Sequence, residues 1–304
     1  MSRRRKLFAV LPTMLTLGNA VCGFGAITFA AKWSGGDPAV SLFIASCLIY
    51  LAMVFDALDG SAARLTNQTS DFGAQLDSLC DAISFGAAPA FLMLQFSLSR
   101  DYPSRLLWLI AALYVVCAVL RLARFNVETD EDDAHDSFSG LPSPAAAGTV
   151  ASFPMMVFWF RNLEDSELVK PSERLASHLN QWTENILPIV TLAVACLMVS
   201  RIRYAHLFNQ LIRGRRSRKH LIQIVFAFAV MFVMPQISVP LFFCVFAFGS
   251  PLRALWNELA IRWWRRSQPQ PVAIGGATVP AADTDWTRGE AESHEPNDDD
   301  RDDA

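Results

Sequence analysis

Long apolar runs separated by short polar segments dominate most of this chain. Most of them lie at residues 11–31, 39–63, 72–97, 106–123, 186–200, 221–234 and 237–255, and a further run enters through 140–147 and ends near 160. A helix needs about 20 predominantly apolar residues to cross a bilayer. The pattern therefore predicts an all-α fold: a polytopic membrane helical bundle with about eight transmembrane helices. The boundary between the last two runs falls at Pro235.

Three regions follow from this pattern. Residues 1–10 form a basic N-terminus, 11–266 an integral membrane domain, and 267–304 an acidic tail rich in Pro, Gly, Asp and Glu that is expected to be disordered. A basic start before an apolar run can also be a secretory signal peptide. We favour a first transmembrane helix, because many more apolar runs follow and no cleavage site precedes Lys32.

Composition agrees with a membrane protein. Of 304 residues 52% are hydrophobic and 18% are charged, and the mean hydropathy is +0.27. That balance is unusual for a soluble domain. The net charge of −3 hides a split, because basic residues lie between the apolar runs and acidic residues gather in the tail.

The distribution of basic residues predicts the orientation in the membrane. With about eight spans both termini lie on one side, and the basic segments fall on that same side, namely 2–6, Arg64, Arg121, Arg124, 201–219 and 262–266. Lys and Arg are enriched in cytoplasmic loops of membrane proteins. We therefore expect this side, where the carboxylates described next lie, to be cytoplasmic.

Four aspartates in strongly apolar sequence are the main candidates for chemistry. Asp56 and Asp59 are three residues apart, and Asp77 and Asp81 are four apart, so on helices each pair lies on one face. Ionisable groups inside a membrane are costly and usually functional. Four carboxylates in one cluster need a counter-charge, and Mg²⁺ or Mn²⁺ suits hard oxygen ligands. The alternative is that these acids are helix caps or solvated loop residues.

The neighbouring residues fit a substrate with a phosphate head and acyl tails. Arg64 can hold a phosphate oxygen, and Gly60 and Gly73 allow close approach of a ligand. One carboxylate can take a proton from an attacking hydroxyl, although spacing does not say which. Asn19, within the first apolar run, either makes an interhelical hydrogen bond or contacts a nucleotide.

The whole pattern resembles the signature of the CDP-alcohol phosphatidyltransferase family, D-x2-D-G-x2-A-R-x8-G-x3-D-x3-D, with every fixed position matched. The resemblance implies transfer of a phosphatidyl group from a CDP-linked lipid to an alcohol, with release of CMP. It implies that Asp56, Asp59 and Asp77 bind two divalent cations, and that Asp81 is the general base and touches the second cation. It also implies a homodimer. The residues expected at the CDP-diacylglycerol head are Gly60, Ala63, Arg64, Ser70, Gly73 and Asn19.

Further stretches resemble the bacterial phosphatidylserine synthase branch of this family. They are residues 70–90, 121–126 and 140–145, with shorter ones at 15–19 and 200–204, and the likeness covers about residues 8–255. This branch implies L-serine as acceptor and the inner membrane of a bacterium as location. Arg121 or Arg124 can then bind the serine carboxylate. Both arginines are otherwise explained as topology determinants or as attractors of phosphate.

Other functions remain as alternatives at this stage. The same chemistry can use glycerol phosphate, inositol phosphate or choline as acceptor. Intramembrane carboxylates also occur in transporters and channels, although no inverted repeat is evident here. A non-catalytic scaffold with an anion-binding loop at 201–219 is the third possibility. The expected partners are CDP-diacylglycerol, L-serine and membrane lipids, without nucleic acid.

Overall fold

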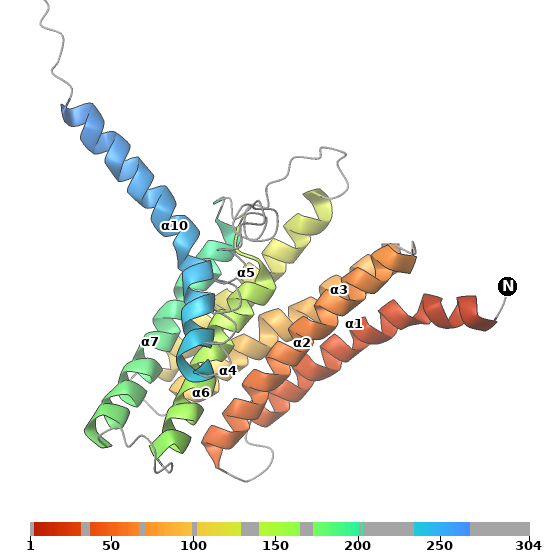
Figure 1. The fold of residues 1–304 in the computed structure, drawn as a ribbon, viewed down its shortest axis with the longest axis horizontal. Helices are drawn as coiled ribbons and strands as arrows, with labels where there is room; N and C mark the ends of the chain where they lie inside the picture. Colours follow the sequence, from red (N-terminus) through yellow and green to blue (C-terminus); the bar gives the residue numbers. More distant parts are fainter. Residues whose placement is uncertain are drawn as a thin grey trace, which may run out of the picture. The chain divides into compact units, whose positions relative to one another are not determined.

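The computed structural model describes residues 3–31, 37–66, 71–98, 102–128, 140–164, 173–200, 202 and 234–267. Every regular element in these ranges is helical, which confirms the predicted all-α class. The helices are α1 (Arg3–Ala30), α2 (Pro38–Thr66), α3 (Asp71–Asp81), the π-helix η1 (Ala82–Ala87), α4 (Ala88–Ser97), α5 (Ser104–Glu128), α6 (Ser143–Glu164), α7 (Glu173–Val199) and α10 (Pro235–Ser267) (Figure 1). The chain divides into two compact units, Met1–Glu258 and Leu259–Ala304, and the site lies in the first.

Five stretches of the described helices are long and apolar enough to cross a membrane. They are Pro12–Ala30, Pro38–Ala62, Phe72–Ser97, Ser104–Val127 and Gln181–Val199. A shorter apolar stretch is Ile237–Arg253, and α6 coincides with the fifth predicted run without being among the five. Residues 221–233, the loop at 201–219 apart from residue 202, and the tail from residue 268 lie outside the described residues. The count of about eight spans therefore stays a prediction.

The surface of the described helices carries many large apolar side chains, unlike that of a water-soluble protein. Large apolar side chains point outward, such as Val21 at 71% and Trp108 at 64% exposure, whereas Asn19, Ser84 and Thr191 are fully buried. Exposed apolar surface of this extent marks contact with lipid, and polar groups inside hydrocarbon must find partners within the protein. Together with the long apolar helices, this pattern indicates an integral membrane protein.

Small residues let the first two helices pack closely. α1 and α2 run along one another and bury four alanines between them and their neighbours: Ala26, Ala30, Ala45 and Ala52. Without a hydrophobic force between helices in lipid, close contact of small side chains is what holds helices together. A second buried cluster joins α4, α5, α6 and α7 around Tyr114, Leu187 and Val194. The element η1 contacts α1, α5 and α6.

A turn at Gly140 fixes the start of α6 against the end of α7. Gly140 has φ of 90°, its N–H donates to Ile202 O at 2.9 Å, and Leu141 N–H donates to Leu197 O at 3.1 Å. A Cβ at Gly140 would collide with Met198 O and lie 3.1 Å from Ser200 O. Only glycine adopts this backbone region without strain.

Gly140→Ala is therefore expected to lower the free energy of unfolding by about 1–3 kcal/mol, the cost of strained backbone. Thermal unfolding of purified protein in detergent measures this. Gly249→Ala is the matched control, because nothing lies within 4 Å of a Cβ there and alanine favours a helix interior. Equal melting temperatures for Gly140→Ala and wild type would contradict the conclusion that position 140 requires glycine.

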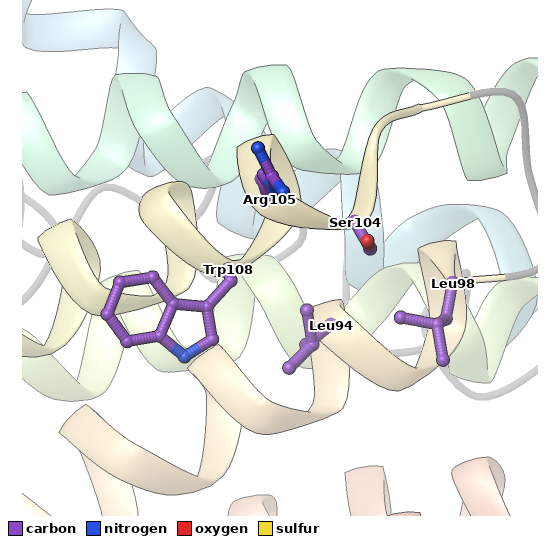
Figure 2. Close-up of a pocket in the computed structure, with 5 residues that line it drawn as sticks. All are labelled: Leu94, Leu98, Ser104, Arg105 and Trp108. Atoms are coloured by element: carbon purple, nitrogen blue, oxygen red, sulfur yellow. The ribbon is translucent and has the colours of Figure 1, made fainter.

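A groove of about 410 Å³ lies between the end of α4 and the start of α5. It is lined by Leu94, Leu98, Ser104, Arg105 and Trp108 (Figure 2). Leu98 follows the end of the span that begins at Phe72, so the groove is at the far end of this span from Asp77. At about 1.5 Å per residue this separation is on the order of 30 Å. The groove is therefore not part of the carboxylate site.

Candidate functional site

The four predicted aspartates lie on two helices that follow one another in the chain. Asp56 and Asp59 are near the end of α2, and Asp77 and Asp81 are in α3. Because a helix places residues three or four apart on one face, each pair presents its side chains in one direction. Both pairs therefore lie on helices, as the spacing predicts, and the connection at 67–70 is outside the described residues.

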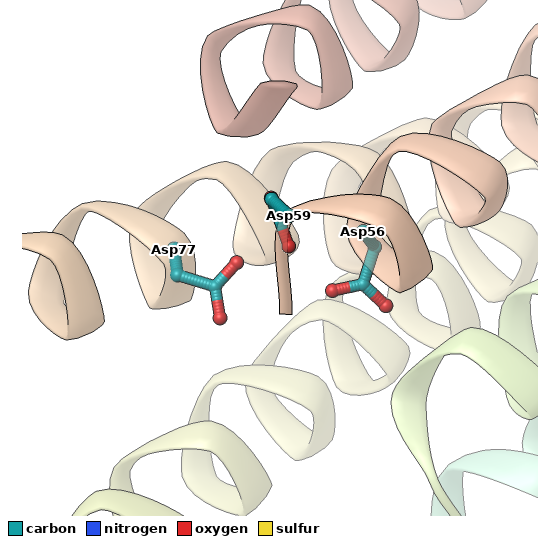
Figure 3. A group of neighbouring side chains, drawn as sticks. All are labelled: Asp56, Asp59 and Asp77. Atoms are coloured by element: carbon teal, nitrogen blue, oxygen red, sulfur yellow. The ribbon is translucent and has the colours of Figure 1, made fainter. Parts of the chain in front are cut away.

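Three carboxylates meet in one place. Asp56, Asp59 and Asp77 each offer an oxygen, and these three oxygens lie within 4.8 Å of one another. Figure 3 shows the carboxylates of Asp56 and Asp77 pointing toward one another from different helices, with Asp59 between them. Like charges at this separation repel strongly where water is scarce. With all three carboxylates ionised, the arrangement requires a positive counter-charge.

Two carboxylate oxygens support a divalent cation as that counter-charge. Asp59 Oδ2 and Asp77 Oδ1 are buried and have no hydrogen-bond partner among the described residues. Buried charged groups are normally paired or bind a metal. Carboxylate oxygens from several side chains are the ligands that Mg²⁺ and Mn²⁺ prefer. The donor set therefore fits the expected cations.

Asp81 lies one turn beyond Asp77 on α3 and is not one of the three carboxylates that meet within 4.8 Å. It is 8% exposed, and its Oδ1 accepts a hydrogen bond of 2.9 Å from Asn19 Nδ2 on α1. It is close enough to Asp56 and Asp77 for direct electrostatic interaction. Of the two roles considered for Asn19, the interhelical hydrogen bond is present. The contact with a nucleotide stays a prediction.

Arg121 on α5 places a positive charge near this cluster. Its guanidinium interacts electrostatically with Asp81 and Asp56. Its Nη1 donates to Ser143 Oγ at 2.7 Å, and its Cζ lies 6.0 Å from the centre of the Phe125 ring. These contacts hold the cation between α5 and the start of α6. Arg124, one turn further along α5, is half-buried.

The remaining predicted residues are placed less fully. Gly60 is exposed, and a Cβ there would meet nothing within 4 Å, so a ligand can approach the backbone. Gly73 is half-buried in α3. Ala63 and Arg64 lie in the last turns of α2, but the structure does not describe their side chains, and Ser70 lies outside the described residues. Their contacts with a substrate stay predictions.

Sequence reasoning missed three features around the cluster. Thr16, which precedes Asn19 by one helical turn, places its hydroxyl beside the Asp59 carboxylate and 3.0 Å from Pro12 O. Ser78 and Asn126 exchange hydrogen bonds of 2.9–3.1 Å between α3 and α5. The π-helix η1 starts directly after Asp81. The spacing of Thr16 from Asn19 could have indicated the first feature.

Comparisons with known proteins agree with the motif. The sequence profile of CDP-alcohol phosphatidyltransferases matches residues 9–191, which include the whole motif. The CDP-diacylglycerol–serine O-phosphatidyltransferase of Helicobacter pylori is 29% identical over 253 residues, covering 83% of this chain and 94% of that protein. The archaetidylserine synthase of Methanothermobacter thermautotrophicus is 35% identical over 199 residues, 65% of this chain and 70% of that protein. A third relative, the CDP-diacylglycerol–serine O-phosphatidyltransferase of Mycobacterium tuberculosis, is 38% identical over 149 residues, or 48% of this chain and 49% of that protein. The chain therefore belongs to the CDP-alcohol phosphatidyltransferase family.

Proposed function

We propose that this enzyme transfers the phosphatidyl group of CDP-diacylglycerol to L-serine, forming phosphatidylserine and releasing CMP. The observation that carries the proposal is the set of carboxylates that face one another from α2 and α3, with buried oxygens lacking a partner among the described residues. The printed names of two relatives support the choice of acceptor, because one is a CDP-diacylglycerol–serine O-phosphatidyltransferase and the other an archaetidylserine synthase.

Asp56, Asp59, Asp77 and Asp81 would together hold two divalent cations, Mg²⁺ or Mn²⁺. Bound there, the cations neutralise a diphosphate and the charge that develops as a bond to phosphorus breaks. The site lies at the end of two apolar helices, so the acyl chains can remain in the bilayer while the head reaches the carboxylates.

Asp81 would act as general base. The serine hydroxyl oxygen attacks the phosphorus that carries the diacylglycerol, the bond from this phosphorus to the CMP oxygen breaks, and Asp81 accepts the hydroxyl proton. The hydrogen bond from Asn19 engages one Asp81 oxygen and leaves the other for that proton. A base held in one orientation spends a larger fraction of its time in the geometry that allows proton transfer.

The head of CDP-diacylglycerol would lie along the motif. The open space at Gly60 supports close approach of the diphosphate to the backbone of α2. Ala63, Arg64, Ser70 and Gly73 follow Gly60 in the sequence, and Arg64 would supply a positive charge for a phosphate oxygen.

Arg121 is the candidate for the acceptor carboxylate, with Arg124 beside it. A zwitterionic acceptor needs a fixed cation within reach of the base, and Arg121 interacts with Asp81 itself. Hydrogen bonds to charged groups are worth about 1.5–3 kcal/mol. We expect Arg121→Gln to lower kcat/KM for serine by about 10–100-fold, chiefly through KM, with the KM for CDP-diacylglycerol changed by less than about threefold.

Steady-state kinetics with each substrate varied in turn check this prediction. Arg105→Gln is the control, because this arginine is exposed at the far end of α5. A serine KM that is unchanged in Arg121→Gln, in protein that melts like wild type, would remove Arg121 from the acceptor site.

We further infer that residues 11–266 form the catalytic membrane domain, with the site at the cytoplasmic face of a bacterial inner membrane. The basic segments of the sequence support this orientation. The family resemblance favours a homodimer, and the acidic residues after 267 form a tail outside the catalytic domain.

An acceptor screen with purified full-length protein tests the proposal. CMP release from CDP-diacylglycerol is measured with serine, glycerol phosphate, inositol phosphate and choline, each with Mn²⁺ and with a chelator. We expect metal-dependent release with serine and a phosphatidylserine product. Faster CMP release with another alcohol would identify that alcohol, and not serine, as the acceptor. No release with any of them would favour the transporter or the scaffold.

A further inference from the structure

We propose that Asn19 of α1 is a positioning residue that presets the orientation of the Asp81 carboxylate for proton transfer. The proposal rests on the proposed function, because it takes Asp81 as the base. It concerns a helix that lies outside the carboxylate motif, and it assigns to that helix an effect on the rate of the reaction and not only on stability.

The contact itself is short and shielded from solvent. Asn19 is 0% exposed, and its Nδ2 donates to Asp81 Oδ1 at 2.9 Å. The two residues are 62 positions apart in sequence and lie on different helices. A carboxylate that accepts one fixed hydrogen bond cannot rotate freely about its Cβ–Cγ bond. The amide is also neutral, so it orients Asp81 without competing with cations for the negative charge of the cluster.

The backbones on both sides of this contact are held in register. Ser84 Oγ, three residues after Asp81, donates to the Asn19 backbone O at 2.9 Å. Gly23 lies one turn after Asn19, and a Cβ there would come within 2.7 Å of Ser84 Cα. The backbones of α1 and η1 therefore approach as closely as glycine allows. On the opposite side, Tyr114 Oη donates to Phe85 O at 3.2 Å.

The π-helical turn explains how Ser84 reaches α1. η1 begins at Ala82, directly after Asp81, and a π-turn inserts an additional residue relative to the α-helical repeat. Such insertions change the direction of the side chains that follow and are frequent at functional sites. Here the turn lets Ser84 bond the backbone of the same residue whose side chain bonds Asp81.

The second polar atom of the Asn19 amide makes no hydrogen bond among the described residues. Asn19 Oδ1 is buried without a hydrogen-bond partner among the described residues. Among the described residues, the hydrogen bond that this side chain makes is the one to Asp81. A buried polar group with half its hydrogen-bonding capacity unused is costly, and a role of the bond to Asp81 in the reaction would account for this cost.

The experiment compares Asn19→Leu with Tyr50→Phe. The first removes the donor at similar side-chain volume. The second removes an interhelical hydrogen bond of the same length, from Tyr50 Oη to Gly148 O at 2.9 Å, between α2 and α6. Three quantities are measured on full-length protein: melting temperature, kcat and KM for both substrates, and Mn²⁺ binding by electron paramagnetic resonance.

We expect similar losses of melting temperature in the two variants but different kinetics. Loss of a residue that orients a metal ligand typically costs about 10–100-fold. Asn19→Leu should therefore lower kcat by about 10–100-fold with both KM values within about threefold, and weaken one of two bound Mn²⁺ ions about tenfold. Tyr50→Phe should keep kcat and Mn²⁺ binding near wild type.

Each other result overturns the proposal. An Asn19→Leu variant with the kcat and Mn²⁺ binding of Tyr50→Phe has lost only a structural bond, and a rise confined to the KM for CDP-diacylglycerol makes Asn19 a nucleotide contact. If the wild type releases no CMP with serine, the proposed acceptor fails separately. The Mn²⁺ titration then still decides whether Asn19 orients Asp81.

Discussion

Asp81→Asn is expected to lower kcat by about 10³-fold while the protein remains folded. General base catalysis contributes about 10²–10⁴-fold, and asparagine cannot accept the proton of the attacking hydroxyl. The side chain keeps its shape, and its amide oxygen can still accept the hydrogen bond that Asn19 donates to Asp81 in the wild type. The measurement is the rate of CMP release at saturating CDP-diacylglycerol and serine.

The control for this variant is Asp37→Asn. Asp37 stands at the start of α2 and lies 3.9 Å from Arg161, with both side chains about half exposed. An exposed ion pair of this kind contributes little to stability, so the same chemical change there should leave kcat and melting temperature near wild type. An Asp81→Asn enzyme with more than a tenth of wild-type activity would refute the assignment of the base.

Asp59→Asn is expected to change activity and metal-free stability in opposite directions. Removing one of three crowded carboxylates relieves repulsion, so the variant should melt at or above the wild-type temperature in chelator. Lewis-acid stabilisation is worth several kcal/mol, and about 1.4 kcal/mol is tenfold in rate. We therefore expect activity to fall by about 10²–10³-fold.

Thermal unfolding with increasing Mn²⁺ separates this account from a purely structural one. A ligand at about 100 times its Kd stabilises the native state by about 2.7 kcal/mol. Wild type and Asp37→Asn should gain melting temperature with Mn²⁺, whereas Asp59→Asn should gain much less. A lower metal-free melting temperature together with an undiminished response to Mn²⁺ would mean that Asp59 is structural.

The carboxylate cluster was predictable because the residues that form it lie close together in the sequence. The intervals between Asp56 and Asp59 and between Asp77 and Asp81 match a helical repeat, and the intervening segment is too short to separate the two helices widely. Apolar periodicity likewise indicated the helices themselves. The structure adds that Asp59 and Asp81 are buried and that three of the carboxylates meet within 4.8 Å.

Tertiary contacts to the cluster were less predictable. The sequence left two roles open for Asn19, because nothing in it indicates that the Asn19 amide contacts Asp81, which lies 62 residues later in the chain. The π-turn from Ala82 to Ala87 has no marker in an apolar run. Nor did spacing reveal that Arg121 bonds Ser143. Such contacts depend on how helices cross, which hydrophobic periodicity does not specify.

Some helices extend beyond the apolar runs, because polar residues continue them. α7 begins at Glu173, and its candidate span begins at Gln181, earlier than the apolar run that starts at residue 186. α1 begins at Arg3, well before the apolar run at residue 11. Hydropathy locates the portion of a helix in lipid, whereas backbone hydrogen bonding continues beyond it.

Anomalous scattering from crystals of the full-length protein grown with Mn²⁺ tests the metal site most directly. The account predicts strong peaks between α2 and α3, about 2.0–2.5 Å from carboxylate oxygens, with Asp56, Asp59 and Asp77 around the first and Asp81 beside the second. Carboxylates that stay close together in the presence of Mn²⁺, with no anomalous peak among them, would contradict it.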